Sequence, residues 1–188
     1  VGLATAQPAT REAATLPSGI VAARLLDKAR AATTRPAWDE ASEAYQELLE
    51  KHPNAIVQVG ERTYRSASQL ALGEMAKWPK EGLAAYRTRY DGAARAALEG
   101  AKDEAELYRV ALRYFHTDAG RDAGLKVMER GSAEGNWPVV FTVGRRLLDW
   151  HSTLGAHRPA VLYWVGVALE RTGNSQEAEA ALGELREK

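Results

Sequence analysis

The strongest constraint on the fold is a series of short helical segments separated by turns of only a few residues. Apolar residues at helical spacing, interrupted by glycine, proline and N-capping residues, divide the chain into about nine such segments. Turns such as Thr117-Asp118 and Gly173-Asn174-Ser175 are too short for a crossover, so neighbouring helices must run antiparallel. The chain is therefore expected to be all-α. The predicted helices cover residues 18–32, 36–52, 66–77, 79–100, 104–115, 119–133, 137–150, 159–172 and 175–187.

Alanine supports this assignment. The chain contains 35 Ala against 12 Val and 2 Ile, so the best helix-forming residue far outnumbers the β-branched aliphatic residues. In the first helix, apolar residues recur at a spacing that places them on one face, which we expect to pack on the core. This stripe consists of Ile20, Val21, Leu25, Ala29 and Ala32.

One segment breaks the helical pattern. Val57 and Val59 alternate with Gln58 and Gly60, and a period of two is typical of an extended strand. The sequence therefore predicts a short extended piece or a hairpin between residues 56 and 64.

The helix pairs share one internal spacing. Counted from Pro159, positions 4, 7, 11 and 24 are apolar, and Gly166 and Ala178 occupy positions 8 and 20. The same positions counted from Glu104 and from Ala22 are again mostly apolar or small. A small residue on each helix of a pair lets the two helices approach closely. This spacing resembles the tetratricopeptide repeat, which implies antiparallel hairpins stacked in a right-handed superhelix.

Three residues depart from this spacing. Lys28 in the first copy and Arg130 in the middle copy occupy positions where an apolar residue is expected. Val140 occupies a position where a small residue is expected. The alternative is an alanine-rich helical bundle without a true repeat, because in a chain so rich in alanine almost any choice of repeat start places alanines at the small positions.

Two longer stretches, residues 63–98 and 107–148, add a narrower resemblance. They contain a Tyr-Arg helix after a Trp-Pro break, then an Arg-Tyr-Phe-His-Thr hairpin, then a hairpin that turns at glycine. Together they resemble the N-terminal helical-repeat region of large secreted bacterial proteins that continue into a pyrroloquinoline-quinone-like β-propeller. The resemblance implies that this chain is the helical part, and it assigns no chemistry to any residue.

The composition argues against several functional classes. The chain has 188 residues, no cysteine, and 25 Lys+Arg balanced by 25 Asp+Glu. A chain without cysteine has no disulfide scaffold, thiolate metal site or cysteine nucleophile. Zero net charge argues against a general nucleic-acid binder, and no apolar run approaches the roughly 20 residues that span a bilayer. We therefore expect no nucleic-acid partner and no membrane insertion.

The titratable residues do not form a pattern typical of an active site. His151 and His157 are six residues apart, which is not the i, i+4 spacing that places two metal ligands on one helix face. A helical lytic transglycosylase is the alternative that would make the chain an enzyme, but it requires a catalytic domain with a Glu-Ser pair, and the chain has no such dipeptide. We therefore predict no enzyme activity, no catalytic residue, no cofactor and no metal.

The tetratricopeptide frame also predicts a partner-binding face. Positions 2, 5, 9, 12 and 13 of the first helix in each pair line the concave groove of such repeats. The chain has five Trp and seven Tyr against two Phe, and amphipathic rings are enriched at interfaces. The alternative is that Tyr108 and Phe115 pack against the neighbouring hairpin. The candidate partner-binding residues are Tyr108, Leu112, Phe115, His116, Tyr163, Val167 and Arg171.

Five arginines form a local basic stretch. Carboxylates at helical spacing accompany two of them, so a solvated helix face is the favoured interpretation, and docking of an acidic partner is the alternative. The arginines are Arg62, Arg65, Arg87, Arg89 and Arg95.

The first residues favour an exported protein. Ala4-Thr5-Ala6 fits the small-x-small pattern that precedes signal-peptidase cleavage, so residues 1–16 are expected to be a flexible remnant of an export signal. Residues 17–188 are expected to form a single helical-repeat domain. A periplasmic or secreted location is predicted, with the cytoplasm as the alternative, because a chain without cysteine fits either.

These features predict a non-enzymatic protein–protein interaction scaffold within a larger envelope or secreted protein. Its concave face would bind a peptide, a protein or a neighbouring domain of the same polypeptide. The alternative is a structural spacer that holds a β-propeller or another domain and has no ligand of its own.

Overall fold

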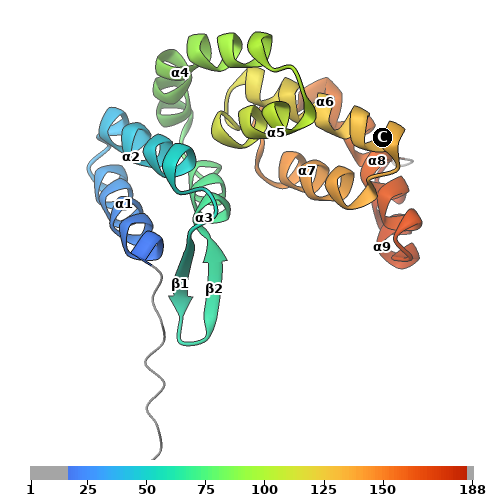
Figure 1. Ribbon diagram of the computed structural model, residues 1–188, viewed down its shortest axis with the longest axis horizontal. Helices are drawn as coiled ribbons and strands as arrows, with labels where there is room; N and C mark the ends of the chain where they lie inside the picture. Colours follow the sequence, from blue (N-terminus) through green and yellow to red (C-terminus); the bar gives the residue numbers. More distant parts are fainter. Residues whose placement is uncertain (1–16, 186–188) are drawn as a thin grey trace, which may run out of the picture.

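The computed structural model describes residues 17–185, and these are mostly helical (Figure 1). Each predicted helix is found, with its ends within a few residues of the expected ones, and the extended segment forms a hairpin. The helices are α1 (Pro17–Thr34), α2 (Trp38–Lys51), α3 (Ala67–Met75), α4 (Lys80–Gly100), α5 (Glu104–Arg113), α6 (Asp118–Glu134), α7 (Trp137–Trp150), α8 (Arg158–Arg171) and α9 (Ser175–Gly183). A 3₁₀ turn, η1 (Gly155–His157), precedes α8, and the strands are β1 (Ile56–Gly60) and β2 (Thr63–Ser66). The predicted export remnant, residues 1–16, lies outside the described residues, as do residues 186–188.

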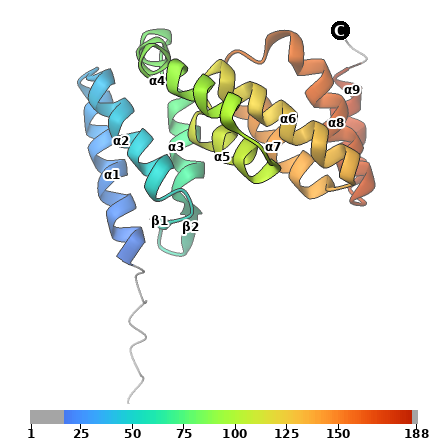
Figure 2. The same ribbon diagram turned by 45° about the horizontal axis from the view of Figure 1, so that its top comes forward.

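The helices form an arch with two limbs (Figures 1 and 2). Helices α1 to α3 and the β-hairpin make the first limb, and α5 to α9 make the second. Consecutive helices pack side by side in the pairs α1/α2, α5/α6, α6/α7, α7/α8 and α8/α9. Helix α4 contacts both α2 and α6, so it joins the two limbs at the top of the arch in Figure 1.

Side-chain caps make the short turns possible. The carboxylate of Asp103 accepts a hydrogen bond from the backbone N–H of Glu106 at 2.7 Å, and the hydroxyl of Thr117 accepts one from Gly120 at 3.0 Å. Both bonds satisfy N–H groups that the first turn of a helix leaves unpaired. At the end of α6, Gly135 adopts φ 73°, a left-handed conformation that favours glycine. The next helix can therefore begin almost at once.

The predicted core stripe of α1 is partly wrong. Ile20 and Val21 are 45% and 43% exposed, whereas Ala22 and Leu26 are buried. The first turn of α1 lies beside the hairpin, where a β-carbon on Gly19 would come within 2.7 Å of the Ile56 carbonyl oxygen. The face of α1 that packs on α2 is therefore rotated away from Ile20 and Val21.

Glycines allow neighbouring helices to pack closely. A β-carbon on Gly166 of α8 would lie 2.6 Å from Leu182 Cγ of α9. Lys28 and Arg130 depart from the spacing and are both exposed. Val140 is fully buried because Gly131 of α6 makes room for it, so the small residue stands on the opposite helix of that pair.

We predict that Gly144→Ala destabilises the fold by about 1–3 kcal/mol. A β-carbon at this position in α7 would lie 2.9 Å from Met128 Cε and would also overlap Val165. Urea unfolding followed by circular dichroism measures the change in the free energy of unfolding.

Gly92→Ala is the matched control for Gly144→Ala. Gly92 also lies inside a helix, but a β-carbon there would meet no atom within 4 Å. This variant should gain roughly 0.5–1 kcal/mol, because alanine favours helix more than glycine does. Equal losses in the two variants would mean that helix propensity, and not close packing, sets the effect.

Candidate functional site

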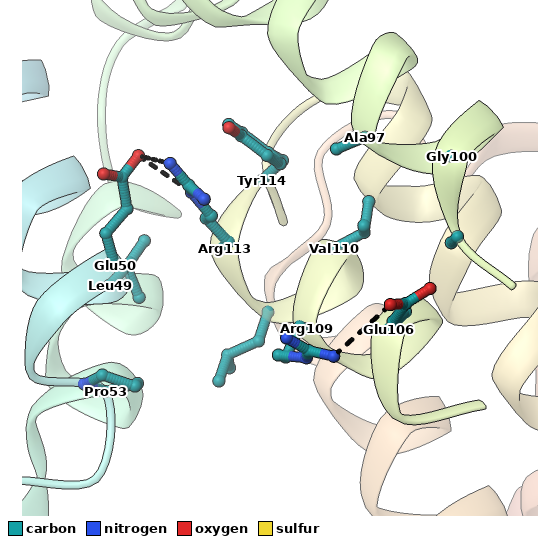
Figure 3. A pocket seen from close by; sticks show the side chains of 12 residues that line it. Leu49, Glu50, Pro53, Ala97, Gly100, Glu106, Arg109, Val110, Arg113 and Tyr114 are labelled. Atoms are coloured by element: carbon teal, nitrogen blue, oxygen red, sulfur yellow. Dashed lines mark hydrogen bonds and ion pairs between the residues drawn. The ribbon is translucent and has the colours of Figure 1, made fainter. Parts of the chain in front are cut away.

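A cleft of about 530 Å³ opens between α2, α4 and α5 (Figure 3). The ends of α2 and α4 and most of α5 supply its walls. Most of its lining side chains are apolar or small, and the charged ones come from α2 and α5. The lining residues are Leu49, Glu50, Pro53, Ala97, Gly100, Ala101, Glu106, Arg109, Val110, Leu112, Arg113 and Tyr114.

One side of the cleft is fixed by a chain of polar contacts that joins three helices. Arg113 of α5 donates from Nε to Glu50 Oε1 of α2 at 2.8 Å, and its Nη2 pairs with the same oxygen. Gln46 Nε2 also donates to this oxygen, at 2.9 Å. The buried hydroxyl of Tyr86 in α4 donates to Gln46 Oε1 at 2.8 Å. The distance across the cleft from α2 to α5 is therefore set by bonded side chains.

The other charged position is open to solvent. The Arg109 side chain is 72% exposed, and its Nη2 lies 3.8 Å from Glu106 Oε1. Glu106 itself accepts a hydrogen bond from the backbone N–H of Lys102 at 2.7 Å. A pair this long and this exposed contributes little stability, so Arg109 can pair with a carboxylate on a ligand instead. The cleft thus offers an apolar wall next to an accessible cation.

The predicted partner-binding residues do not form one face. Leu112 lines the cleft. Tyr108 is half-buried nearby, where its hydroxyl accepts a hydrogen bond from Arg146 Nη1 at 3.1 Å. Tyr163 is exposed on α8, and its ring makes a T-shaped contact with the Trp164 ring.

The remaining two candidates of α8 lie apart from the cleft lining. Val167 is half-buried, and the exposed Arg171 places its guanidinium 5.8 Å from the centre of the Trp137 ring. The candidates on α8 therefore belong to a different surface from Leu112.

Phe115 and His116 must be removed from the predicted binding surface. Their exposed fractions are 4% and 1%, so neither side chain can reach a partner. The tetratricopeptide spacing predicted that both residues lie on the groove side of α5. That helix ends at Arg113, however, and both residues are buried in the connection to α6. The Phe115 ring packs in T-shaped contacts against the rings of His116 and His151.

His116 and His151 are held in the neutral form. Burial lowers the pKa of His116 to about 3 and that of His151 to about 4. His116 Nε2 donates to the Leu72 carbonyl at 3.0 Å, which ties the second limb to α3. His151 Nε2 donates to the Thr117 carbonyl at 3.3 Å, and its Nδ1 accepts from the Thr153 N–H. Both histidines therefore have a structural role.

The α2 and α4 walls of the cleft could not be predicted from the sequence pattern. Leu49 and Pro53 carry no local signal for a site, since they belong to an ordinary amphipathic helix and its end. They become a wall only because the turn after α4 brings α5 back opposite α2.

Metal sites and membrane spans are both absent from residues 17–185. No group of three or more His, Asp or Glu residues in this range could hold a metal ion. None of the helices in the same range is long and apolar enough to cross a membrane.

We predict that Tyr86→Phe lowers the free energy of unfolding by about 1–3 kcal/mol, because the buried Gln46 Oε1 loses its donor. Chemical denaturation measures this loss. Tyr163→Phe, which removes a hydroxyl from an exposed ring, should have almost no effect. A similar loss in both variants would contradict the structural role of the Tyr86 hydroxyl.

We predict that the fold loses stability as the pH falls below about 6.5. The unfolded chain protonates both histidines near that pH, whereas the folded chain does so only near about 3 and about 4. Each histidine should then cost about 1.4 kcal/mol per pH unit between about pH 6 and pH 4.5. Urea unfolding at several pH values measures the slope, and His151→Asn should roughly halve it. An unchanged slope in that variant would exclude His151 as a cause.

Comparison of the chain with protein-family models, with curated proteins and with solved structures gives no match. The residues and their geometry are therefore the basis for inferring a function.

Proposed function

We propose that the chain is a non-enzymatic interaction scaffold built from tetratricopeptide-like helix hairpins that stack as a right-handed superhelix. It would belong to a larger envelope or secreted protein, in the periplasm or outside the cell. The packed pairs of consecutive helices and the close approach at Gly166 support the repeat. The Ala4-Thr5-Ala6 pattern supports the location.

The cleft between α2, α4 and α5 is the observation that carries this proposal. A space of about 530 Å³ with apolar walls suits one or two apolar side chains of an extended peptide segment. Arg109 at its edge suits a carboxylate next to those side chains in the same segment. The partner is thus a peptide, a protein segment or a neighbouring domain of the same polypeptide.

The state of the cleft carboxylates supports binding over acid–base chemistry. Glu50 is held by Arg113 and Gln46, and Glu106 accepts a backbone hydrogen bond. A general acid or base needs a free proton-transfer position within reach of a substrate. Glu50 instead holds α2 against α5, and Glu106 caps the start of its own helix.

Affinity capture tests the proposal. The immobilised chain is exposed to an extract of the source cells, and the retained proteins are identified by mass spectrometry. A partner that binds in the cleft should be retained by the wild type and reduced at least about tenfold by Leu112→Glu/Arg109→Glu, because a buried charge and a reversed charge oppose it. Calorimetry with the identified partner then measures the affinity of each variant.

Arg130→Glu is the control for this charge change. Arg130 is exposed on α6, does not line the cleft and should leave retention unchanged. A Tyr163→Ala/Arg171→Ala variant tests the α8 surface separately. If no partner is retained, or if all variants retain the same proteins, the cleft is not a binding site and the spacer function takes its place.

A further inference from the structure

Exposed apolar side chains gather at one end of the molecule. Six large apolar side chains are exposed in the described part of the chain, and five of them belong to the start of α1 and to the hairpin. Both views place these two elements side by side (Figures 1 and 2). The five are Ile20, Val21, Ile56, Val59 and Tyr64, with exposed fractions between 43% and 54%.

The register of the hairpin places Ile56 and Tyr64 on one face and Arg65 on the other. Ile56 pairs with Ser66 and Gln58 pairs with Tyr64, so Ile56 and Tyr64 are diagonal neighbours on one face. Arg65 pairs with Val57 and therefore belongs to the opposite face. Val57 is buried, but the Arg65 side chain reaches solvent.

The outer edge of β2 has no strand beside it. The sheet has two strands within residues 17–185, and the start of α1 lies against β1 at the Ile56 carbonyl. Backbone groups in an antiparallel pair point alternately toward the partner strand and away from it. The Ala67 N–H donates to the Ala55 carbonyl at 2.8 Å, so by this alternation the N–H and C=O of Tyr64 lie on the outer edge. That edge can accept another strand.

The charges of the hairpin indicate what kind of strand can bind at this edge. Arg62 and Arg65 are exposed, and neither forms an ion pair within the part of the chain that the structure describes. Glu61 is the single carboxylate between residues 56 and 66, which leaves the hairpin basic. A second copy of the chain is a poor occupant, because antiparallel pairing of two β2 strands would gather four arginines.

We propose that the outer edge of β2 binds an acidic, extended segment of a partner protein as an added strand. Successive side chains of a strand point to opposite faces. The segment would therefore place apolar side chains beside Tyr64 and carboxylates beside Arg65, in alternation. Its backbone would bond to Tyr64, as in other cases of strand addition. This site lies on a different surface from the cleft and extends the scaffold function to a second partner segment.

A labelled peptide of alternating glutamate and valine tests this site directly. Fluorescence anisotropy should detect binding that weakens with added salt, and a lysine–valine peptide should not bind. Hydrogen exchange followed by NMR should show slower exchange of the Tyr64 N–H when the peptide is present. Binding of both peptides alike, or an unchanged exchange rate at Tyr64, would overturn the proposal.

Variants of the hairpin test the charge and the backbone contribution separately. Arg62→Glu/Arg65→Glu should weaken binding at least about tenfold, while the exposed Arg95→Glu in α4 should not. Tyr64→Pro, which removes the outer N–H and is tolerated on an edge strand, should also abolish binding, with circular dichroism as the check on folding. Equal binding by the double variant and Arg95→Glu would refute the charge argument.

Two further measurements separate strand addition from membrane binding and from the cleft. Vesicles of phosphatidylcholine and phosphatidylglycerol test whether the basic, apolar end of the molecule binds a bilayer. Binding to vesicles but not to the acidic peptide would overturn strand addition in favour of a membrane surface. The cleft variant Leu112→Glu/Arg109→Glu should bind the peptide normally, so loss of the cleft partner and loss of the strand partner are independent results.

Discussion

Helix α4 sets the geometry on which the rest of the molecule depends. Its two consecutive residues Tyr86 and Arg87 bond to both limbs of the arch. The Tyr86 hydroxyl bonds to Gln46 of α2, while Arg87 donates to the His116 carbonyl and to the Ser152 hydroxyl in the second limb. Because the first two of these contacts are partly or fully buried, solvent screens them weakly. The cleft lies beneath this helix, between α2 of the first limb and α5 of the second (Figure 3).

A second constraint is the scarcity of large side chains on several packed faces. Alanine supplies much of the core of α1 and α2, and glycines bring other helices together. Gly144 and Gly166 allow side chains of the next helix to approach the backbone. Close contacts of this kind give protein interiors their dense packing. An alanine-rich chain thereby forms a large core cluster that runs through both limbs, and a second, smaller cluster between α4, α5 and α6.

The cleft and the outer edge of β2 are formed by different interactions. The cleft exists because Arg113 and Glu50 are bonded across it, and its walls come from segments far apart in the sequence. The β2 edge exists because α1 lies against β1 and leaves β2 without a neighbour. On the two proposals, the first surface would select a ligand by volume and by the charge of Arg109, and the second by backbone pairing and charge. A chain with both proposed binding surfaces would hold two partner segments at once.

The sequence by itself determined the local structure. Helix spacing, caps such as Asp103 and Thr117, and the alternation around Val57 depend on neighbours a few residues away, so the helices and the hairpin followed from the pattern. The burial of residues was harder to predict, because it depends on which face each helix turns toward its partners. Ile20 was expected in the core and is exposed, while Phe115, a surface candidate with packing against the neighbouring hairpin as the alternative, is buried. Only the tertiary structure decided where the cleft and the open strand edge lie, because contacts between distant segments create both.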